Sequence, residues 1–433
     1  MQITTENKTS RLLKILQRIS VILCLFVPYT CSIFASLMGK FLRSGDVYLI
    51  AIAFIALCVL LRHSSKIYIR RNTFITLLLF LLPISSMLLK GIEIQNEFLQ
   101  YSMALLFVLI FVNYDDWQEF TINFIEAMGV FYSVTVILQI IMPTAFNLFA
   151  LTLLPIDGMY SYNLLRSNGY ACGLTSQSSI VCCYISFGLF SIISKIIYAK
   201  NIGKKISLFQ LAKLVVMVVA LLLTGKRGHL IFTVFAYLVL LYVLTNNKPS
   251  KRLKLIFSIV FVLAIVYVLY VNLWADSDLQ IMNSMDRIFG ADSVASALNG
   301  RSEYYDIMLN LISRNPVTGI GWEHFRNYSG SGNNGHNIYL QLLTELGVIG
   351  GVLFILLLGL ILLRTIKSLK IVIQNGSTNE NSRITLLYFS IVSQVFFVTY
   401  GITGNPLYDT EYIGMLMIII TLSIYSQKIV MER

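Results

Sequence analysis

The chain has 433 residues, of which 57% are hydrophobic and only 12% are charged, and its mean hydropathy is +0.75. A soluble domain carries about 25% charged residues, so this chain has too few polar side chains to cover a surface that faces water. The composition excludes a soluble enzyme, a disordered chain and a secreted disulfide scaffold, and it indicates an integral membrane protein. The formal net charge of +12 comes from basic residues between apolar segments, which set membrane topology, so we expect no nucleic-acid partner.

Twelve apolar segments of membrane-spanning length follow one another along the chain, because about 20 residues cross a bilayer as a helix. They lie at residues 19–38, 46–62, 72–90, 98–113, 121–142, 172–194, 208–224, 229–245, 253–273, 337–363, 384–400 and 411–427. Their continuous apolar character argues against an outer-membrane barrel, whose strands alternate apolar and polar residues. We predict an all-α integral membrane protein with about 12 transmembrane helices, in a single polytopic membrane domain that covers residues 1–433.

The loops between these segments differ in their content of basic residues. With the N-terminus in the cytoplasm, the cytoplasmic segments hold 22 Lys and Arg, and the outer loops hold 6 when the long loop at 274–336 is left out. Basic residues in short loops keep those loops in the cytoplasm, whereas long loops cross the membrane regardless of charge. We predict that both termini are cytoplasmic and that the first segment is a retained anchor rather than a cleaved signal peptide.

The polar residues of the chain are concentrated in two outer segments. The large extracytoplasmic loop, at about 274–336 between helices 9 and 10, holds four arginines, seven carboxylates and a glycine-rich tail. A second segment, at about 143–171, is less apolar than its neighbours and contains Arg166. Loops positioned by a rigid scaffold often carry function, so we expect the working face of the protein on the outer side.

A short basic turn connects two predicted spans on that side. Residues 224–229 read Thr-Gly-Lys-Arg-Gly-His, so Lys226 and Arg227 lie at the membrane surface or just within it. An arginine at the centre of a membrane helix costs about 2.5–3.5 kcal/mol, and less near the interface. One interpretation is a basic turn whose side chains snorkel to the interface. The other is a guanidinium that binds an anionic headgroup, ideally phosphate, through two parallel hydrogen bonds.

Residues 301–314 have the apolar spacing of an amphipathic helix, whose apolar face we expect to lie on the membrane surface. Pro316 predicts that this helix stops after Arg314. Arg301 falls in its first turn, where the unpaired backbone N–H groups also attract anions. The alternative interpretation is a surface helix with ordinary charges.

A histidine begins the polar face of the tenth predicted span. His336 follows the glycine-rich stretch, and Asn337, Gln341 and Glu345 come next at intervals of four residues. Polar side chains inside a membrane need partners, so this stripe is expected to face protein or a wet cavity. A single histidine is usually only interfacial, but its position at the mouth of the stripe makes His336 a candidate catalytic or binding residue.

No residues show the spacing of a metal site. The six cysteines lie in or beside apolar runs, and the four histidines form no ligand pair. Asp276 and Asp278 have the form of an Asp-x-Asp metal–nucleotide motif, but they follow directly on a span, where a polar stop explains them. We expect neither a metal nor a cofactor.

Three motifs together resemble the O-antigen ligase/polymerase family of bacterial surface-polysaccharide assembly. They are Thr-Gly-Lys-Arg-Gly at 224–228, Gly-Arg at 300–301 opening the helix that ends in Asn-Pro-x-x-Gly-x-Gly at 315–321, and His-Asn-x-Tyr-Leu at 336–340 with Glu-x-Gly-x-x-Gly at 345–350. In the first motif a lysine replaces the family's usual serine. A fourth, degenerate match begins at Arg166, but it lacks the Asn-Pro-Asn that the family tends to have.

The resemblance implies a metal-independent membrane glycosyltransferase of the bacterial cytoplasmic (inner) membrane. Its donor would be a glycan on undecaprenyl diphosphate, and its working face would be extracytoplasmic. By resemblance, Arg227 and Arg301 bind the diphosphate and His336 is the catalytic base. Candidates for further substrate contacts are Arg166, Lys226, Asn337, Gln341 and Glu345.

The resemblance leaves the acceptor open. A polymerase transfers the growing chain to another lipid-linked repeat unit of an O-antigen or capsule, whereas a ligase transfers the polymer to lipid A–core. The compact motif that begins at His336 favours a polymerase. A chain-length regulator and a flippase are candidate partners besides membrane lipid. A transporter or flippase is the alternative of another class, but neither paired repeats nor broken helices are visible in the sequence.

Overall fold

The computed structural model describes residues 2–29, 44–61, 71–90, 96–154, 156–245, 301–375 and 381–428. All secondary-structure elements within these ranges are helices, which confirms the all-α class. Six of these helices are long and apolar enough to cross a membrane, by length and composition. They are α4 (Arg71–Leu89), α6 (Gln118–Ile141), α9 (Ser178–Asn201), α11 (Arg227–Leu244), α17 (Ile338–Asn375) and α18 (Asn381–Tyr400).

The remaining described helices are shorter or less apolar. They are α1 (Gln2–Tyr29), α3 (Ser44–Leu60), α5 (Asn96–Phe111), α7 (Pro143–Leu153), α8 (Ile156–Ser167), α10 (Leu208–Leu223), α15 (Arg301–Arg314), α16 (Phe325–Tyr328) and α19 (Thr410–Lys428). Eleven of the twelve predicted spans overlap with helices, although residues 30–38 of the first span lie outside the described residues and residues 172–177 of the sixth precede α9. The predicted span at 253–273 and the first part of the large loop, 274–300, lie outside the described residues. The number of twelve membrane helices and the position of the loop between the ninth and tenth therefore stay predictions.

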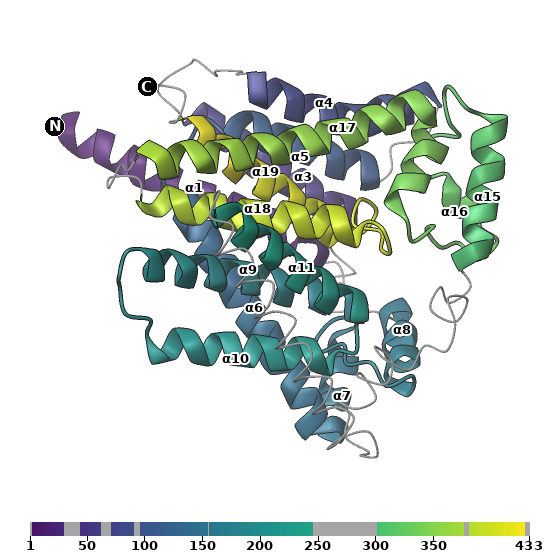
Figure 1. Ribbon diagram of the computed structural model, residues 1–433, viewed down its shortest axis with the longest axis horizontal. Coiled ribbons are helices and arrows are strands. Elements are labelled where there is room, and N and C mark those ends of the chain that lie inside the picture. The colour runs from purple at the N-terminus through teal and green to yellow at the C-terminus, as the bar shows by residue number, and fades with distance from the viewer. Residues whose placement is uncertain are drawn as a thin grey trace. The chain divides into compact units, whose positions relative to one another are not determined.

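The described chain divides into two compact units, and the prediction of one polytopic domain stays a prediction. The first unit contains Met1–Glu126, Leu153–Pro155 and Gly300–Arg433, and the second contains Ala127–Thr152 and Ile156–Asn299. In the first unit, α17 packs against α4, α15 and α18, and α19 packs against α5 and α18 (Figure 1). In the second unit, α9 packs against α10 and α11.

Glycines bring α6 and α9 together within the second unit. A Cβ atom at Gly129 would lie 2.7 Å from the Cα of Gly188, and 3.0 Å from the sulfur of Met217 on α10. Small residues let membrane helices approach closely, which increases the packing contacts between them. The same close approach explains why α9 is buried over most of its first five turns.

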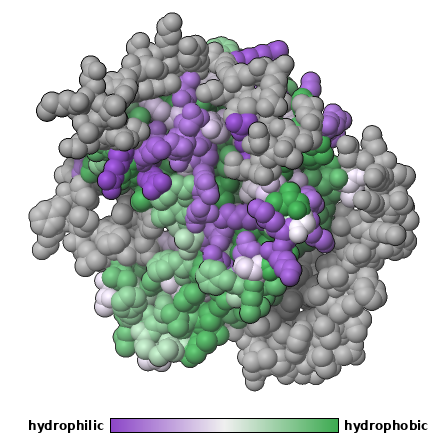
Figure 2. All heavy atoms as spheres, turned by 90° about the vertical axis from the view of Figure 1, so that its left-hand side faces the viewer, coloured by the Kyte–Doolittle hydropathy of each residue, from purple (hydrophilic) through white to green (hydrophobic). Residues whose placement is uncertain are grey.

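The described surface combines hydrophilic and hydrophobic areas. Figure 2 shows one face, on which a band of hydrophilic side chains borders a broad hydrophobic surface. Large apolar side chains are exposed on helices of membrane-spanning length, including Phe131 (50% exposed), Ile231 (52%) and Leu356 (58%). Exposed apolar area of this extent marks an interaction surface. On helices of membrane-spanning length, lipid tails are the expected partner of this surface.

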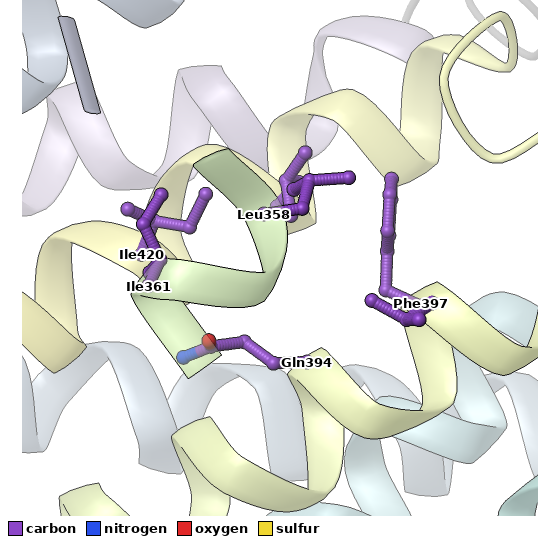
Figure 3. A pocket seen from close by; sticks show the side chains of 7 residues that line it. Leu358, Ile361, Gln394, Phe397 and Ile420 are labelled. Carbon is purple, nitrogen blue, oxygen red and sulfur yellow. The ribbon is translucent and has the colours of Figure 1, made fainter. Parts of the chain in front are cut away.

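A small pocket lies among α17, α18 and α19 (Figure 3). Its lining is mostly apolar and consists of Leu358, Ile361, Gln394, Phe397, Val398, Leu416 and Ile420. Its volume of about 10 Å³ corresponds to the room that about one water molecule needs. The pocket is too small for a sugar or a lipid chain.

Candidate active site

Arg301 is the first residue of α15, and the helix ends at Arg314, as Pro316 predicts. The guanidinium Nη1 of Arg301 donates a hydrogen bond of 2.9 Å to the carbonyl oxygen of Thr403. This contact uses one of several N–H donors of the guanidinium. Arg301 is therefore held in place by the protein backbone at the end of the helix that most favours an anion.

The apolar face of α15 is covered by protein, which corrects the expectation that it lies on the membrane surface. Met308 is fully buried and Leu311 is 8% exposed, and both pack with Phe325. Ile320 and Leu340 complete this small core. The reason is that the chain folds back after α15, so that α16 and the start of α17 bury the apolar side chains that would otherwise need lipid.

His336 lies between the glycine-rich stretch and α17, and its backbone has the left-handed conformation, with φ of 53°. Non-glycine residues rarely adopt this conformation, which surrounding structure must enforce. The side chain is partly exposed, and its Nδ1 lies 3.1 Å from Nδ2 of Asn405. Asn405 belongs to the turn Gly401–Asp409, which connects α18 to α19.

The same turn thus contacts both Arg301 and His336. Thr403 accepts the hydrogen bond from Arg301, and Asn405 contacts the imidazole of His336. The backbone N–H of Ile338, two residues after His336, also donates to the carbonyl oxygen of Gly401 at 2.9 Å. The structure therefore brings these two predicted site residues to one turn of the first unit.

The polar stripe on α17 connects this helix to the preceding loop. Asn337 precedes the first helical residue, and its Oδ1 accepts from the backbone N–H groups of Tyr339 (3.0 Å) and Leu340 (3.1 Å), which is the arrangement of an N-cap. Gln341 is fully buried, and its Oε1 accepts from the backbone N–H of Gly335 at 2.9 Å. Both side chains therefore fix the position of the backbone around His336.

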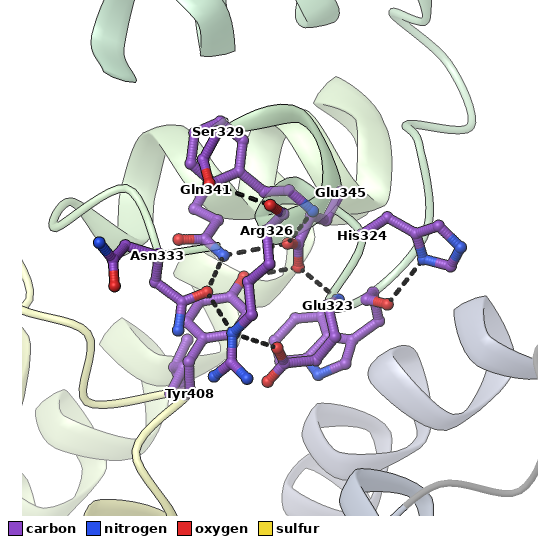
Figure 4. A network of polar contacts seen from close by, with 12 residues as sticks. Glu323, His324, Arg326, Ser329, Asn333, Gln341, Glu345 and Tyr408 are labelled. Carbon is purple, nitrogen blue, oxygen red and sulfur yellow. Dashed lines mark hydrogen bonds and ion pairs between the residues drawn. The ribbon is translucent and has the colours of Figure 1, made fainter. Parts of the chain in front are cut away.

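Glu345 is the centre of a buried hydrogen-bond network (Figure 4). Its Oε1 accepts from Nε2 of Gln341 (3.0 Å) and from the backbone N–H of Phe325 (3.2 Å). Its Oε2 accepts from the backbone N–H of Glu323 (3.0 Å) and from the hydroxyl of Tyr408 (2.8 Å). Because the residue is fully buried and both carboxylate oxygens are engaged, Glu345 anchors the loop to α17 and to the turn that contains Tyr408.

Glu323 extends this network toward the surface. Its backbone is also left-handed, with φ of 63°, and its Oε2 forms an ion pair of 3.2 Å with Nε of Arg326. Arg326 donates from the same nitrogen to Oδ1 of Asn334 at 3.2 Å. Burial raises the pKa of Glu323 well above its usual value; Arg326 opposes this effect and the nearby Glu345 adds to it.

The glycines of the second and third motifs interlock. The helical conformation of α17 is broken at Gly347, with φ of 71° and ψ of 172°. The freed carbonyl oxygens of Thr344 and Glu345 accept from the backbone N–H groups of Ile320 (2.9 Å) and Gly321 (3.0 Å). A Cβ atom at Gly347 would collide with the carbonyl of Val317. Irregular backbone in a membrane protein needs hydrogen-bond partners within the protein. Because Gly347 has no side chain, the loop can approach closely enough to supply them.

The other candidate cations belong to the second unit. Arg227 is the first residue of α11, and Lys226 precedes it as the N-cap residue. Gly225, with φ of 71°, permits the sharp turn after α10. The ammonium of Lys226 lies 5.0 Å from the ring centroid of Tyr170, a cation–π contact. Arg166 lies in the last turn of α8 and is exposed. The predicted pairing of Arg227 with Arg301 on one diphosphate stays a prediction.

The turn Gly401–Asp409 is the part of the site that the sequence analysis misses. Its polar residues touch Arg301, His336 and Glu345, but they follow the matched motifs by more than fifty residues. A signal was present, because Thr-Gly-Asn-Pro at 403–406 is a polar stretch between two apolar spans on the predicted outer side. Among the described residues, no group of three or more His, Cys, Asp or Glu side chains could hold a metal ion.

The six helices of membrane-spanning length and composition are consistent with a polytopic membrane protein, and the described residues bring Arg301 and His336 to one turn. Within this class, a sequence model of the O-antigen ligase family matches residues 212–355, which is about a third of the chain. The match covers all three principal motifs and confirms the resemblance to the O-antigen ligase/polymerase family over this part of the chain. No curated protein matches the chain.

Proposed function

We propose that the protein is a polymerase of lipid-linked oligosaccharide repeat units, of the O-antigen or capsule type. It transfers the growing glycan from undecaprenyl diphosphate to an incoming lipid-linked repeat unit on the outer face of the bacterial inner membrane. The observation that carries the proposal is that Arg301 and His336 are both held by the turn Gly401–Asp409, beside motifs that match the O-antigen ligase family. A cation and a base near one another are what a transfer from a diphosphate requires.

In the proposed reaction, a hydroxyl oxygen of the acceptor sugar attacks the anomeric carbon of the donor glycan. The bond from this carbon to the diphosphate oxygen breaks, and its electron pair leaves with the lipid diphosphate. Arg227 and Arg301 stabilise this negative charge through planar guanidinium groups. His336, in its neutral form, takes the proton of the attacking hydroxyl.

The remaining candidates divide into two roles in this proposal. Arg166 and Lys226 bind sugar or phosphate groups of the substrate, for which their partly or fully exposed side chains are accessible. Asn337, Gln341 and Glu345 act on the substrate through the loop that they hold, because their printed hydrogen bonds are made to protein groups. Glu345 is not the base in this scheme, since no acceptor hydroxyl reaches a fully buried carboxylate.

A ligase is the second candidate function, because the match to the O-antigen ligase family supports either reaction and does not distinguish between them. A ligase would use the same donor chemistry but would transfer finished polymer to lipid A–core. The lipid-linked glycans that accumulate in a deletion strain separate the alternatives. Single repeat units on the surface acceptor support the polymerase, whereas long polymer left on undecaprenyl diphosphate supports the ligase. Repeat units trapped on the cytoplasmic face would contradict both and support a flippase.

The proposal also requires the site to face outward. Reporter fusions after Lys248 and Asn375 should give cytoplasmic signals, and fusions near Ser293 and Ser331 should give extracytoplasmic signals. The reason is that most Lys and Arg residues lie in the segments predicted to be cytoplasmic. A cytoplasmic signal from the loop at 274–336 would contradict the proposed orientation. A chain-length regulator and a flippase remain proposed partners, which co-purification from native membranes would test.

A further inference from the structure

The turn Gly401–Asp409 makes three separate contacts to the candidate site, although it lies outside the matched region of the chain. The carbonyl of Thr403 accepts from Arg301, the side chain of Asn405 contacts His336, and the hydroxyl of Tyr408 donates to Glu345. Of these contacts, the one from Asn405 reaches the atom that controls the chemistry of the imidazole.

Asn405 is held rigidly enough to orient a neighbour. Asn405 is 7% exposed, and its backbone carbonyl accepts from the N–H groups of Tyr408 (2.9 Å) and Asp409 (3.0 Å). The amide Nδ2 lies 3.1 Å from Nδ1 of His336, while the amide Oδ1 is buried and has no hydrogen-bond partner among the described residues. Whichever end of the amide faces away from His336 is buried without a partner, so the unpaired end does not decide the orientation of the amide.

The two ends of a side-chain amide have the same shape, so a half-turn of the amide exchanges Nδ2 and Oδ1 without other movement. In the exchanged orientation, Oδ1 accepts a hydrogen bond from Nδ1–H of His336. A neutral imidazole carries one proton, so a proton fixed on Nδ1 leaves the lone pair on Nε2. This is the form of the ring that can take a proton from a hydroxyl.

We propose that Asn405 is a positioning residue for His336: its amide oxygen holds the proton on Nδ1 and thereby keeps Nε2 available as the base. This inference rests on the proposed transfer reaction for its function, but the contact itself is independent of that reaction. The left-handed backbone at His336, with φ of 53°, shows that the surrounding structure holds this residue in a sparsely populated backbone conformation.

The first test measures the tautomer without measuring activity. The full-length protein is labelled with ¹⁵N at its histidine rings and reconstituted in bilayers, and His336→Gln identifies the signal of His336. We expect the signal of the Nδ1–H form in the wild type and a mixture of the two forms in Asn405→Leu. A wild-type spectrum with the proton on Nε2, or one that Asn405→Leu leaves unchanged, would overturn the proposal.

The second test compares transfer rates of reconstituted protein with lipid-linked repeat units. Asn405→Leu should lower turnover by about 10²-fold, the lower end of what loss of a general base costs, while binding of the donor lipid stays unchanged. Asn405→Asp retains an acceptor for Nδ1–H and should stay within about tenfold of the wild type. Thermal unfolding of each variant shows whether the turn is intact.

Ile402→Ala is the matched control, because Ile402 lies in the same turn and is 48% exposed; it should transfer glycan at the wild-type rate. Equal losses in Asn405→Leu and Asn405→Asp, with folding and donor binding retained, would contradict the role of the amide oxygen. A wild type that shows the Asn405-dependent tautomer but transfers no glycan would instead contradict the proposed function and leave the contact between Asn405 and His336 supported.

Discussion

The surroundings of His336 and the turn at Lys226 present candidate site residues in two different ways. The loop before His336 is fixed by side chains from outside it: Gln341 and Glu345 accept hydrogen bonds from the loop backbone, and Tyr408 donates to Glu345. The turn at Lys226 is set mainly by the two helices that it joins, because α10 ends at Leu223 and α11 begins at Arg227, and Thr224 and Lys226 add contacts to Cys182 and Tyr170. Lys226 and Arg227 therefore lie within three or four residues of the end of α10 and at the start of α11.

This difference has a consequence for how each region responds to substitution. In the first region a change far from His336 can displace the histidine, because a buried network transmits the loss of any partner. In the second region the backbone of the turn is set by short covalent connections, so a substitution acts mainly through the side chain that it alters. The predictions below separate loss of chemistry from loss of position in these two regions.

The largest effect is expected from His336→Ala. Loss of a general base lowers the rate by about 10²–10⁴-fold, and the variant should still fold and bind donor lipid because His336 is only partly buried. The measurement is the polymer ladder on gels, normalised to the amount of membrane protein, with donor binding assayed separately. Arg314→Ala at the far end of α15 is the control and should be mild. Near-normal ladders from His336→Ala would remove this residue as the base.

Gly347→Ala tests whether the first region depends on the interlocked glycines. Alanine would have to adopt a positive φ, and its Cβ would meet the carbonyl of Val317, so we expect a loss of stability on the order of 3 kcal/mol. Gly359→Ala on the same helix is the matched control, since its Cβ would meet nothing within 4 Å and alanine favours a helix by about 1 kcal/mol. Equal thermal stability of the two variants would contradict the structural role of Gly347.

Arg227→Lys and Arg301→Lys compare the two regions directly. Lysine keeps the charge but loses the planar donors, and we expect each variant to lose activity by about 10-fold or more, since each lost charge-assisted hydrogen bond is worth about 1.5–3 kcal/mol. Arg301→Lys should have the larger effect, because it also alters the hydrogen bond to Thr403. Donor affinity and turnover should be measured separately. Wild-type activity in both variants would contradict bidentate binding of the diphosphate.

The sequence predicts most of the described helices, because they depend on local patterns, and it names candidate site residues that stay predictions. Apolar runs identify the spans, and the position of Pro316 predicts the end of α15. The break at Gly347 is not predicted, since a glycine in an apolar run is compatible with a continuous helix. The role of Asn405 is not predicted either, because its contact with His336 joins residues 69 positions apart. The apolar face of α15 shows the same limit, since periodicity does not distinguish lipid from protein as its partner.

A smaller effect is expected from pH acting on Glu323. Burial raises its pKa in the folded protein above the ordinary value of 4.5, so the folded state binds a proton more tightly than the unfolded state does. Its contribution to stability is therefore fully present below about pH 4.5 and is lost as the pH rises through the folded pKa. Glu323→Gln should reduce the fall in thermal stability as the pH rises above 4.5. An identical pH dependence in the variant would show that Glu323 stays ionised, paired with Arg326.

No effect is expected from chelation of metal ions, and this outcome tests the assignment of charge stabilisation to arginines in both regions. A leaving diphosphate needs positive charge, which either divalent cations or guanidinium groups supply. Arg227 and Arg301 fulfil this need if they act as proposed, and polymer formation by the purified protein should continue in excess EDTA. Lys226→Ala measured in parallel shows whether the neighbouring ammonium adds to the same charge.

If EDTA stops the reaction and Mg²⁺ or Mn²⁺ restores it, the arginines do not suffice, and Asp276 and Asp278 become the candidate ligands. These two residues lie outside the described residues, so their replacement by alanine is the direct comparison: it should be mild if the guanidinium groups carry the charge, and severe if a metal does.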